Sequence, residues 1–207
     1  MVGPKEKKER ALGERLGLKG DRGMSPKSAF LRKPYRPGMH GPKRGGRPRT
    51  LSEFGLQLRE KRKFKLAYGV DERNLKRLFG MAVAAKGASS TKLLELLERR
   101  LDNVIYRIGF APTRLAARQF VSHGHIVVNA KKVTSPGFLV KQGDVIAVRP
   151  GSETNVAFAK RRELLKKYEA PPWLALMPDK LEGTVLSPPT APDLPFDVKL
   201  LIESFSK

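Results

Sequence analysis

The most suggestive chemical pair in this sequence is His123-Gly124-His125, within the stretch VSHGHIVVN. Two imidazoles on either side of a glycine could hold a metal ion, supply a general base, or lie in a turn without a chemical role. A metal site needs further ligands, but the chain has 3 histidines and no cysteine, and His40 is far away in sequence. Gly124 is expected to separate the end of a helix from the start of a strand, which would point the two rings apart. We therefore expect no metal site and no cofactor.

Catalytic patterns are absent from the rest of the chain. There is no G-x-S-x-G, P-loop, Rossmann glycine pattern or H-E-x-x-H. The clearest acidic cluster is Glu95, Glu98 and Asp102, and it alternates with Arg99 and Arg100, which is typical of ordinary charge on a helix face. The sequence therefore predicts a protein that is not an enzyme and has no small-molecule substrate.

The net charge points to a polyanionic partner. The 207 residues include 42 Lys and Arg against 20 Asp and Glu, for a net charge of +22. Such an excess repels itself in a compact chain unless a polyanion neutralises it, so nucleic acid is the leading partner and an anionic membrane surface the weaker alternative. No apolar run approaches the length of a transmembrane helix, and the start of the chain lacks the apolar region of a secretory signal. The absence of cysteine fits a reducing compartment, so we expect a cytoplasmic location.

The charge is concentrated away from the C-terminal end. Residues 1–50 contain 15 Lys or Arg and 4 Asp or Glu, whereas residues 171–207 contain 3 Lys or Arg and 5 Asp or Glu. Residues 1–50 are also rich in Gly and Pro, with little amphipathic periodicity after Leu18. They are either a disordered tail or a basic arm that becomes ordered along a phosphate backbone. The stretch PGMHGPKRGGRPRT favours the arm, because its glycines allow close backbone approach while its cations supply charge.

Helical patterns dominate the middle of the chain. Ser52 or a Thr50/Glu53 capping box begins a basic helix that ends at Gly69, and Asp71 begins a second helix that ends at Gly87. Apolar residues at helical spacing then predict one continuous helix over residues 91–108. A short helix follows from Thr113 to Gly124.

The pattern changes to that of strands after Gly124. HIVVN and KKVTS read as two strands joined around Asn129-Ala130, although Ala130 is not the glycine that a type I′ turn prefers. A further strand covers Val145–Val148. AKRRELLKKYEA predicts a solvent-facing basic helix, and VKLLIESF predicts a final amphipathic helix that packs against the body of the protein.

Basic residues of the short helix and the hairpin form the best candidate surface for nucleic acid. Arg114 and Arg118 are four residues apart and so share a helix face, with Lys131 and Lys132 in the hairpin just beyond. Aromatic residues are few and scattered, which favours recognition of folded RNA by its shape and backbone over base stacking. The full set of candidate RNA-binding residues is Arg59, Lys61, Arg62, Lys63, Lys65, Arg99, Arg100, Arg114, Arg118, Gln119, Ser122, His123, Lys131 and Lys132.

These patterns predict an α+β fold. A mainly helical N-terminal domain with a basic irregular arm precedes a domain of two or more helices and a small antiparallel sheet. The expected divisions are a basic arm at 1–50, a helical RNA-binding domain at 51–90, a second RNA-binding domain at 91–152, and at 153–207 a linker helix and tail that packs back on the helical domain.

The stretch RLDNVIYRIGFAPTRLAARQFVSHGHIVVNAKKV, residues 100–133, closely resembles the S-four RNA-binding domain. Five further stretches are similar to the bacterial-type small ribosomal subunit protein S-four family: PGMHG, LSEFGLQLREKRK, YGVDERNLKRLF, PPWLALMPDKLEGTV and LLIESFSK. The resemblance therefore spans roughly residues 35 to 207. It implies a structural constituent of the small subunit that binds the 5′ domain of 16S rRNA directly and nucleates assembly. It also implies contact with ribosomal protein S-five and an influence on translational accuracy.

The resemblance further implies basic residues beside the path by which mRNA enters, and the candidates by position are Lys43, Arg44, Arg47 and Arg49. The chain departs from many family members in lacking the N-terminal cysteines that bind zinc, and its first 34 residues match poorly. An RNA-modifying enzyme or a ribosome-rescue factor that uses the S-four domain as a targeting module is the alternative. Only residues 151–207 follow the predicted domain, too few for a catalytic domain, and rescue factors usually lack the long N-terminal helical region.

Overall fold

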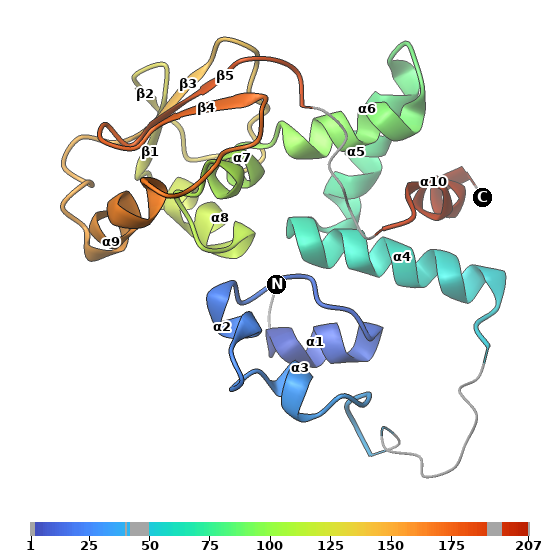
Figure 1. Cartoon of the computed structure of the whole chain (residues 1–207). Coiled ribbons are helices and arrows are strands. Elements are labelled where there is room, and N and C mark those ends of the chain that lie inside the picture. Colours follow the sequence, from blue (N-terminus) through green and yellow to red (C-terminus); the bar gives the residue numbers. More distant parts are fainter. Residues whose placement is uncertain (1–2, 40, 42–49, 190–195, 207) are drawn as a thin grey trace. The chain divides into compact units, whose positions relative to one another are not determined.

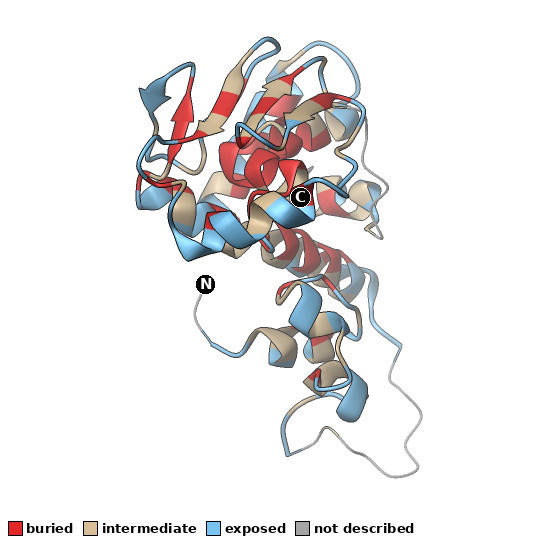
Figure 2. Cartoon of the chain, turned by 60° about the vertical axis from the view of Figure 1, so that its left-hand side comes forward, coloured by how far each residue is buried: buried red, intermediate tan, exposed pale blue. Residues whose placement is uncertain are grey.

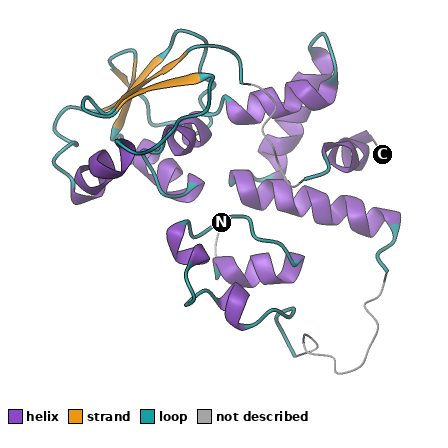
Figure 3. Ribbon diagram, in the orientation of Figure 1, coloured by secondary structure: helices purple, strands orange, loops and turns teal. Residues whose placement is uncertain are grey.

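The computed structural model of the chain describes residues 3–39, 41, 50–189 and 196–206. The chain divides into two compact units, which we call unit 1 (residues 1–84 with 194–207) and unit 2 (residues 85–193). Figures 1 and 3 show that the helices run through both units and that the strands form a sheet in unit 2. The predicted α+β class, with a helical N-terminal region followed by helices and a small antiparallel sheet, is confirmed.

Unit 1 begins with short helices where an irregular arm was expected. They are α1 (Lys5–Leu12), α2 (Asp21–Met24) and α3 (Ala29–Arg32). Leu12, Leu16 and Leu18 are buried together, with Leu66 and Phe196 packed against them. These leucines find their apolar partner in the helix that follows, so residues 3–39 are not the disordered tail that was one of the two alternatives.

Two side chains hold the loops of this N-terminal segment. The buried carboxylate of Glu9 accepts hydrogen bonds from the backbone N–H groups of Leu16 (3.0 Å) and Leu18 (3.1 Å). The guanidinium of Arg10 donates to the carbonyls of Lys33 (2.8 Å) and Tyr35 (3.0 Å) and stacks over the Tyr35 ring. The segment is therefore tied together by side chains that satisfy backbone groups of its loops.

The next two helices begin where their capping residues predict. In α4 (Glu53–Tyr68), the Ser52 hydroxyl accepts from the Gly55 N–H, and Gly69 ends the helix in the left-handed region at φ 65°. Before α5 (Glu72–Ala84), the Asp71 carboxylate accepts from the Asn74 N–H at 2.9 Å. Local sequence chemistry therefore places both starts and the end of α4, whereas α5 ends at Ala84, before the predicted stop at Gly87.

The C-terminal helix returns to the same unit. Helix α10 (Val198–Ser206) packs against α4 and also contacts α5. Leu201 is fully buried, and the Phe79 and Phe205 rings stack with centroids 5.0 Å apart. Two segments far apart in sequence thus build unit 1.

Unit 2 breaks the long helix expected over residues 91–108 into α6 (Ser89–Glu98) and α7 (Leu101–Ile108). At the break, Arg100 has an extended backbone (φ −65°, ψ 135°) and forms an isolated β-bridge with Leu139. The Leu101 N–H donates to the Phe138 carbonyl at 2.8 Å. The helix ends here because backbone groups at the junction pair with a distant segment instead of the next turn.

The sheet of unit 2 is larger than the sequence indicated. Its strands are β1 (Ile126–Val128), β2 (Lys131–Lys132), β3 (Val145–Val148), β4 (Leu174–Met177) and β5 (Glu182–Val185). Within the described residues they form one antiparallel sheet in the order β2-β1-β3-β5-β4. The strands β4 and β5 were not predicted, and they place residues 153–193 in unit 2, whereas the expected boundary lay at residue 152.

The core of unit 2 lies between the sheet and its helices. Helices α7, α8 (Arg114–Ser122) and α9 (Val156–Leu165) lie on one side of the sheet, and Figure 2 shows buried residues along α7 and the neighbouring strands. Ile105, Ile108 and Ile146 are fully buried in this core. The β1–β2 turn has positive φ at both Asn129 (49°) and Ala130 (64°), which is the type I′ geometry left open by the sequence.

Candidate nucleic-acid interface

Helix α8 presents a polar face to solvent because its apolar residues anchor it from behind. The Thr113 hydroxyl caps it by accepting from the Ala116 N–H at 3.1 Å. Ala117 and Val121 are fully buried in the core of unit 2. On the outside, Arg114 is half-buried, and the exposed residues are Arg118, Gln119, Ser122 and His123.

The hairpin adds two lysines beside the end of this helix. Lys131 and Lys132 are exposed on β2, an edge strand of the sheet. Gly124 ends the helical turn with φ 73°, and a Cβ there would lie 2.3 Å from Lys132 Cε. The Lys132 side chain thus lies over the end of α8. We call the set Arg114, Arg118, Gln119, Ser122, His123, Lys131 and Lys132 the α8–β2 surface.

The two arginines of this surface are held from below by neighbouring residues of α7. Arg114 Nε donates to Asn103 Oδ1 at 2.6 Å, and its guanidinium lies over the Tyr106 ring at 4.5 Å. Arg118 Nη1 lies 3.9 Å from Asp102 Oδ2, while 45% of the Arg118 side chain stays exposed. Arg114 is therefore half-buried and fixed by a hydrogen bond, whereas Arg118 is exposed and pairs with Asp102 only at ion-pair distance.

Arg99 and Arg100 do not belong to this surface. Arg100 is 3% exposed, and its guanidinium forms a two-bond fork with the buried Asp102 carboxylate at 3.1 and 2.6 Å. Burial raises the pKa of the Asp102 carboxyl, and the charge of Arg100 opposes that shift. Arg99 donates to the Val140 carbonyl at 2.8 Å and pairs with Glu95. Both cations are engaged in internal contacts at the α6–α7 break.

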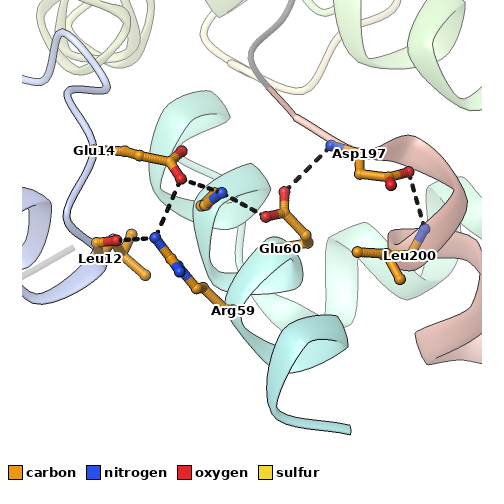
Figure 4. A network of polar contacts seen from close by, with 7 residues as sticks. Leu12, Glu14, Arg59, Glu60, Asp197 and Leu200 are labelled. Carbon is orange, nitrogen blue, oxygen red and sulfur yellow. Dashed lines mark hydrogen bonds and ion pairs between the residues drawn. The ribbon is translucent and has the colours of Figure 1, made fainter. Parts of the chain in front are cut away.

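The basic residues of α4 are largely turned inward as well. Figure 4 shows Arg59 reaching the Leu12 carbonyl (2.7 Å) and Glu14 (3.3 Å). The buried Lys63 ammonium pairs with Glu14 at 2.6 Å and with Glu60. These contacts join the N-terminal segment to α4, so Arg59 and Lys63 are not on the exposed basic face expected from the sequence.

Two further lysines of α4 share one carboxylate. Lys61 and Lys65 lie 2.6 and 2.8 Å from the Glu72 oxygens. Burial would raise the pKa of Glu72, but the hydrogen bonds and charges of these lysines outweigh it and hold that pKa below its ordinary value. Arg62 is the exposed member of the predicted set on α4.

The histidine pair lies differently from the prediction. The His123 and His125 ring centroids are 6.0 Å apart, so the expectation that the rings point apart is wrong. His125 packs edge-on against Phe158, and its Nδ1 lies 3.1 Å from the Ser152 hydroxyl oxygen. Burial, the nearby His123 and Arg149 lower the pKa of His125. In the described part of the chain, no group of three potential metal-ligating side chains occurs.

Sequence reasoning missed one cation beside this pair. Arg149 is exposed, follows β3, and donates its backbone N–H to the His125 carbonyl at 2.8 Å. Its position next to the α8–β2 surface depends on pairing of β1 with β3, which local patterns do not show. The candidates for the mRNA path, Lys43, Arg44, Arg47 and Arg49, lie outside the described residues. Among the described helices, none has the length and apolar character needed to span a membrane.

Comparison with known families first defines the class. Residues 99–146 match the S4 domain, and residues 1–98 match the ribosomal protein S4/S9 N-terminal domain. The α8–β2 surface lies within the first of these matches.

Whole-chain comparison then identifies the family. The chain is 45% identical to "Small ribosomal subunit protein uS4" of Caldicellulosiruptor bescii, with 100% of this chain and 98% of the relative covered. It is 46% identical to the protein of the same name in Thermoanaerobacter sp. (strain X514), with the same coverage. The chain belongs to the uS4 family of small ribosomal subunit proteins, which are structural and not enzymatic, and the resemblance seen in the sequence is confirmed.

Proposed function

We propose that the chain binds the 5′ domain of 16S rRNA directly through the α8–β2 surface and nucleates assembly of the small subunit. The observation that carries this proposal is the arginine pair on one face of α8, in which Arg114 is half-buried and anchored by Asn103 and Arg118 is exposed beside Asp102. Guanidinium groups match phosphate oxygens in two-bond geometry, and a rigid helix fixes where they meet them.

The contacts proposed for this surface are with the RNA backbone. Phe120, the aromatic residue of α8, packs inward on Phe158 at 4.7 Å, which leaves the exposed His123 imidazole at the end of the helix as the ring on this surface. Charged and hydroxyl side chains remain, which bind phosphate and sugar and recognise a folded RNA by its shape.

Family membership supports the wider role. Ribosomal protein S-five and mRNA near its entrance to the subunit are the further partners we propose, together with a contribution to translational accuracy in the cytoplasm. Lys43, Arg44, Arg47 and Arg49 remain the candidates for the mRNA contact. Crosslinking from these four positions in assembled subunits tests that assignment, and crosslinks to rRNA alone would contradict it.

Charge reversal tests the α8–β2 surface. The double variant Arg114→Glu with Arg118→Glu should lower affinity for a transcript of the 5′ domain of 16S rRNA at least about tenfold, because two phosphate contacts become repulsive. The matched control is Lys141→Glu with Lys180→Glu, which changes the same charge at exposed positions of unit 2 outside the surface. Equal losses in both double variants would show that total charge, and not this surface, decides binding.

A further inference from the structure

Asp102 and Asn103 are consecutive residues in the first turn of α7, and each reaches one arginine of α8. Asn103 Oδ1 accepts from Arg114 Nε at 2.6 Å, and Asp102 Oδ2 lies 3.9 Å from Arg118 Nη1. Both α7 side chains are almost fully buried, at 1% and 2% exposure. Buried Asn103 thus holds Arg114 by a hydrogen bond, while Asp102, already engaged by Arg100, lies at ion-pair distance from Arg118 one helical turn away.

The Asn103 amide cannot rotate away from Arg114 without losing other bonds. Its Nδ2 donates to the Glu98 carboxylate at 2.8 Å and to the Glu98 carbonyl at 3.1 Å. Glu98 is itself held by a two-bond fork from Arg107, at 2.9 and 3.0 Å. The chain of contacts from Arg107 through Glu98 and Asn103 to Arg114 therefore fixes the amide orientation that presents an acceptor to Arg114.

The Arg114 guanidinium is constrained from a second direction. Its Cζ lies 4.5 Å from the centroid of the Tyr106 ring, which sits one turn along α7 from Asn103. The hydrogen bond at Arg114 Nε and the Tyr106 ring beneath the guanidinium together restrict both the position and the orientation of that guanidinium group. Ordering a long side chain before binding removes an entropy cost that binding would otherwise carry.

We infer that Asn103 and Tyr106 are positioning residues that hold Arg114 in one position and orientation beside Arg118, so that the surface distinguishes folded RNA from flexible RNA. This inference rests on the proposed function of the α8–β2 surface. A folded RNA presents phosphates at set distances and benefits from set guanidinium groups. A flexible RNA strand adapts to fixed or to mobile guanidinium groups. The affinity for it therefore depends only on the charge of the protein surface.

The test compares binding to two RNAs at one salt concentration, a transcript of the 5′ domain of 16S rRNA and poly(U). Asn103→Leu removes the acceptor while approximately keeping volume, and Tyr106→Leu removes the ring. Each should weaken binding to the transcript about three- to tenfold, the range that corresponds to ordering one long side chain. Poly(U) binding should change less than about twofold, since every cation is retained.

Two controls separate positioning from loss of stability. Tyr106→Phe keeps the ring and should show the wild-type ratio of the affinity for the transcript to the affinity for poly(U). Val104→Ala opens a cavity in the same helix at a fully buried position away from the arginines, and it should lower thermal stability without changing the ratio. If Asn103→Leu does not fold, the Tyr106→Leu and Tyr106→Phe pair decides.

The outcomes distinguish this inference from the function beneath it. Unchanged transcript affinity in Tyr106→Leu, or parallel losses for both RNAs, overturns the positioning role. If Arg114→Glu with Arg118→Glu also binds the transcript normally, the proposed surface itself is wrong. If that double variant loses affinity while the positioning variants keep the wild-type ratio, only the inference fails.

Discussion

Arg100 and Arg118 show how differently one residue type is used within a single RNA-binding unit. Both lie near Asp102, but Arg100 is buried in a two-bond fork, while Arg118 stands 3.9 Å away and remains nearly half exposed. The sequence marked both as candidates because it shows charge and spacing. It does not show that residues 136–140 return to cover the α6–α7 break, which is what buries Arg100.

The β1–β2 turn allows a substitution that stabilises the protein. Ala130 has φ 64°, a conformation that an L-residue other than glycine adopts at a cost. Ala130→Gly should raise the free energy of unfolding by about 0.5–1 kcal/mol, after the greater entropy of glycine in the unfolded chain is subtracted. Denaturant unfolding measures the change.

The neighbouring turn residue supplies the control for this prediction. Asn129 Nδ2 donates to Asp144 at 2.9 Å and its Oδ1 accepts from the Val145 N–H at 3.0 Å. Asn129→Gly removes both bonds and should lower the free energy of unfolding by about 1 kcal/mol. Stabilisation by both glycines, or by neither, would contradict the assignment of strain to Ala130.

His125 should make stability depend on pH near neutrality. Its pKa is lowered by burial and by the charges of His123 and Arg149, so the folded protein binds this proton less readily than the unfolded chain. Stability is then complete above the ordinary histidine pKa of about 6.5 and decreases as pH falls from there toward the folded pKa. Midpoints of urea unfolding, measured at one pH above and one pH below the ordinary histidine pKa, give the decrease in stability. His125→Asn places an amide near Nδ1 and should flatten the dependence, and an equally steep dependence in this variant would refute the assignment.

At the scale of elements, α4 is the helix to which the N-terminal segment and α10 are both attached. Lys63 pairs with Glu14 and Glu60, and Glu60 also accepts from the Asp197 N–H at 3.3 Å before α10 begins. Figure 4 shows these contacts meeting at one place on α4. The ion pairs and this hydrogen bond thus join α4 to one segment from each end of the chain.

Lys63→Ala should therefore destabilise unit 1 strongly. It leaves the largely buried Glu60 carboxylate without its cation, and breaking a buried pair in this way costs about 3 kcal/mol. The adjacent Arg62→Ala is the control, because Arg62 is exposed and its removal should change stability by less than about 0.5 kcal/mol. Equal midpoints for the two variants in thermal unfolding would refute the role of Lys63.

Elements were predictable where a local signal ends them, and not where distant pairing does. Ser52 and Gly69 mark α4 in the sequence, and Thr113 and Gly124 mark α8, because caps act within one turn. The apolar repeat over residues 91–108 continues through the α6–α7 break, so periodicity alone predicts one helix. The strands β4 and β5 are short and flanked by prolines, and they are defined by the pairing of β5 with β3 and of β4 with β5.

At the scale of the whole molecule, the net charge of +22 predicts that RNA binding weakens as the salt concentration rises. Each phosphate contact releases condensed counterions, so about six contacts give a slope of roughly −4 to −5 in log K against log salt concentration. Titrations of the 16S 5′-domain transcript at several salt concentrations measure that slope. A nearly flat dependence would contradict electrostatic binding, whichever surface carries it.

The division of the chain into units has a consequence for how the protein forms during translation. Unit 2 is continuous in sequence, whereas unit 1 needs α10, which follows unit 2 along the chain. A nascent chain emerges in sequence order, so α4 is synthesised well before α10, the helix that packs against it. Unit 2 can acquire its sheet while the apolar side of α4 that Leu201 will cover is still open to water. Most of unit 1 is therefore synthesised first, but its packing is completed last, after α10 has been made.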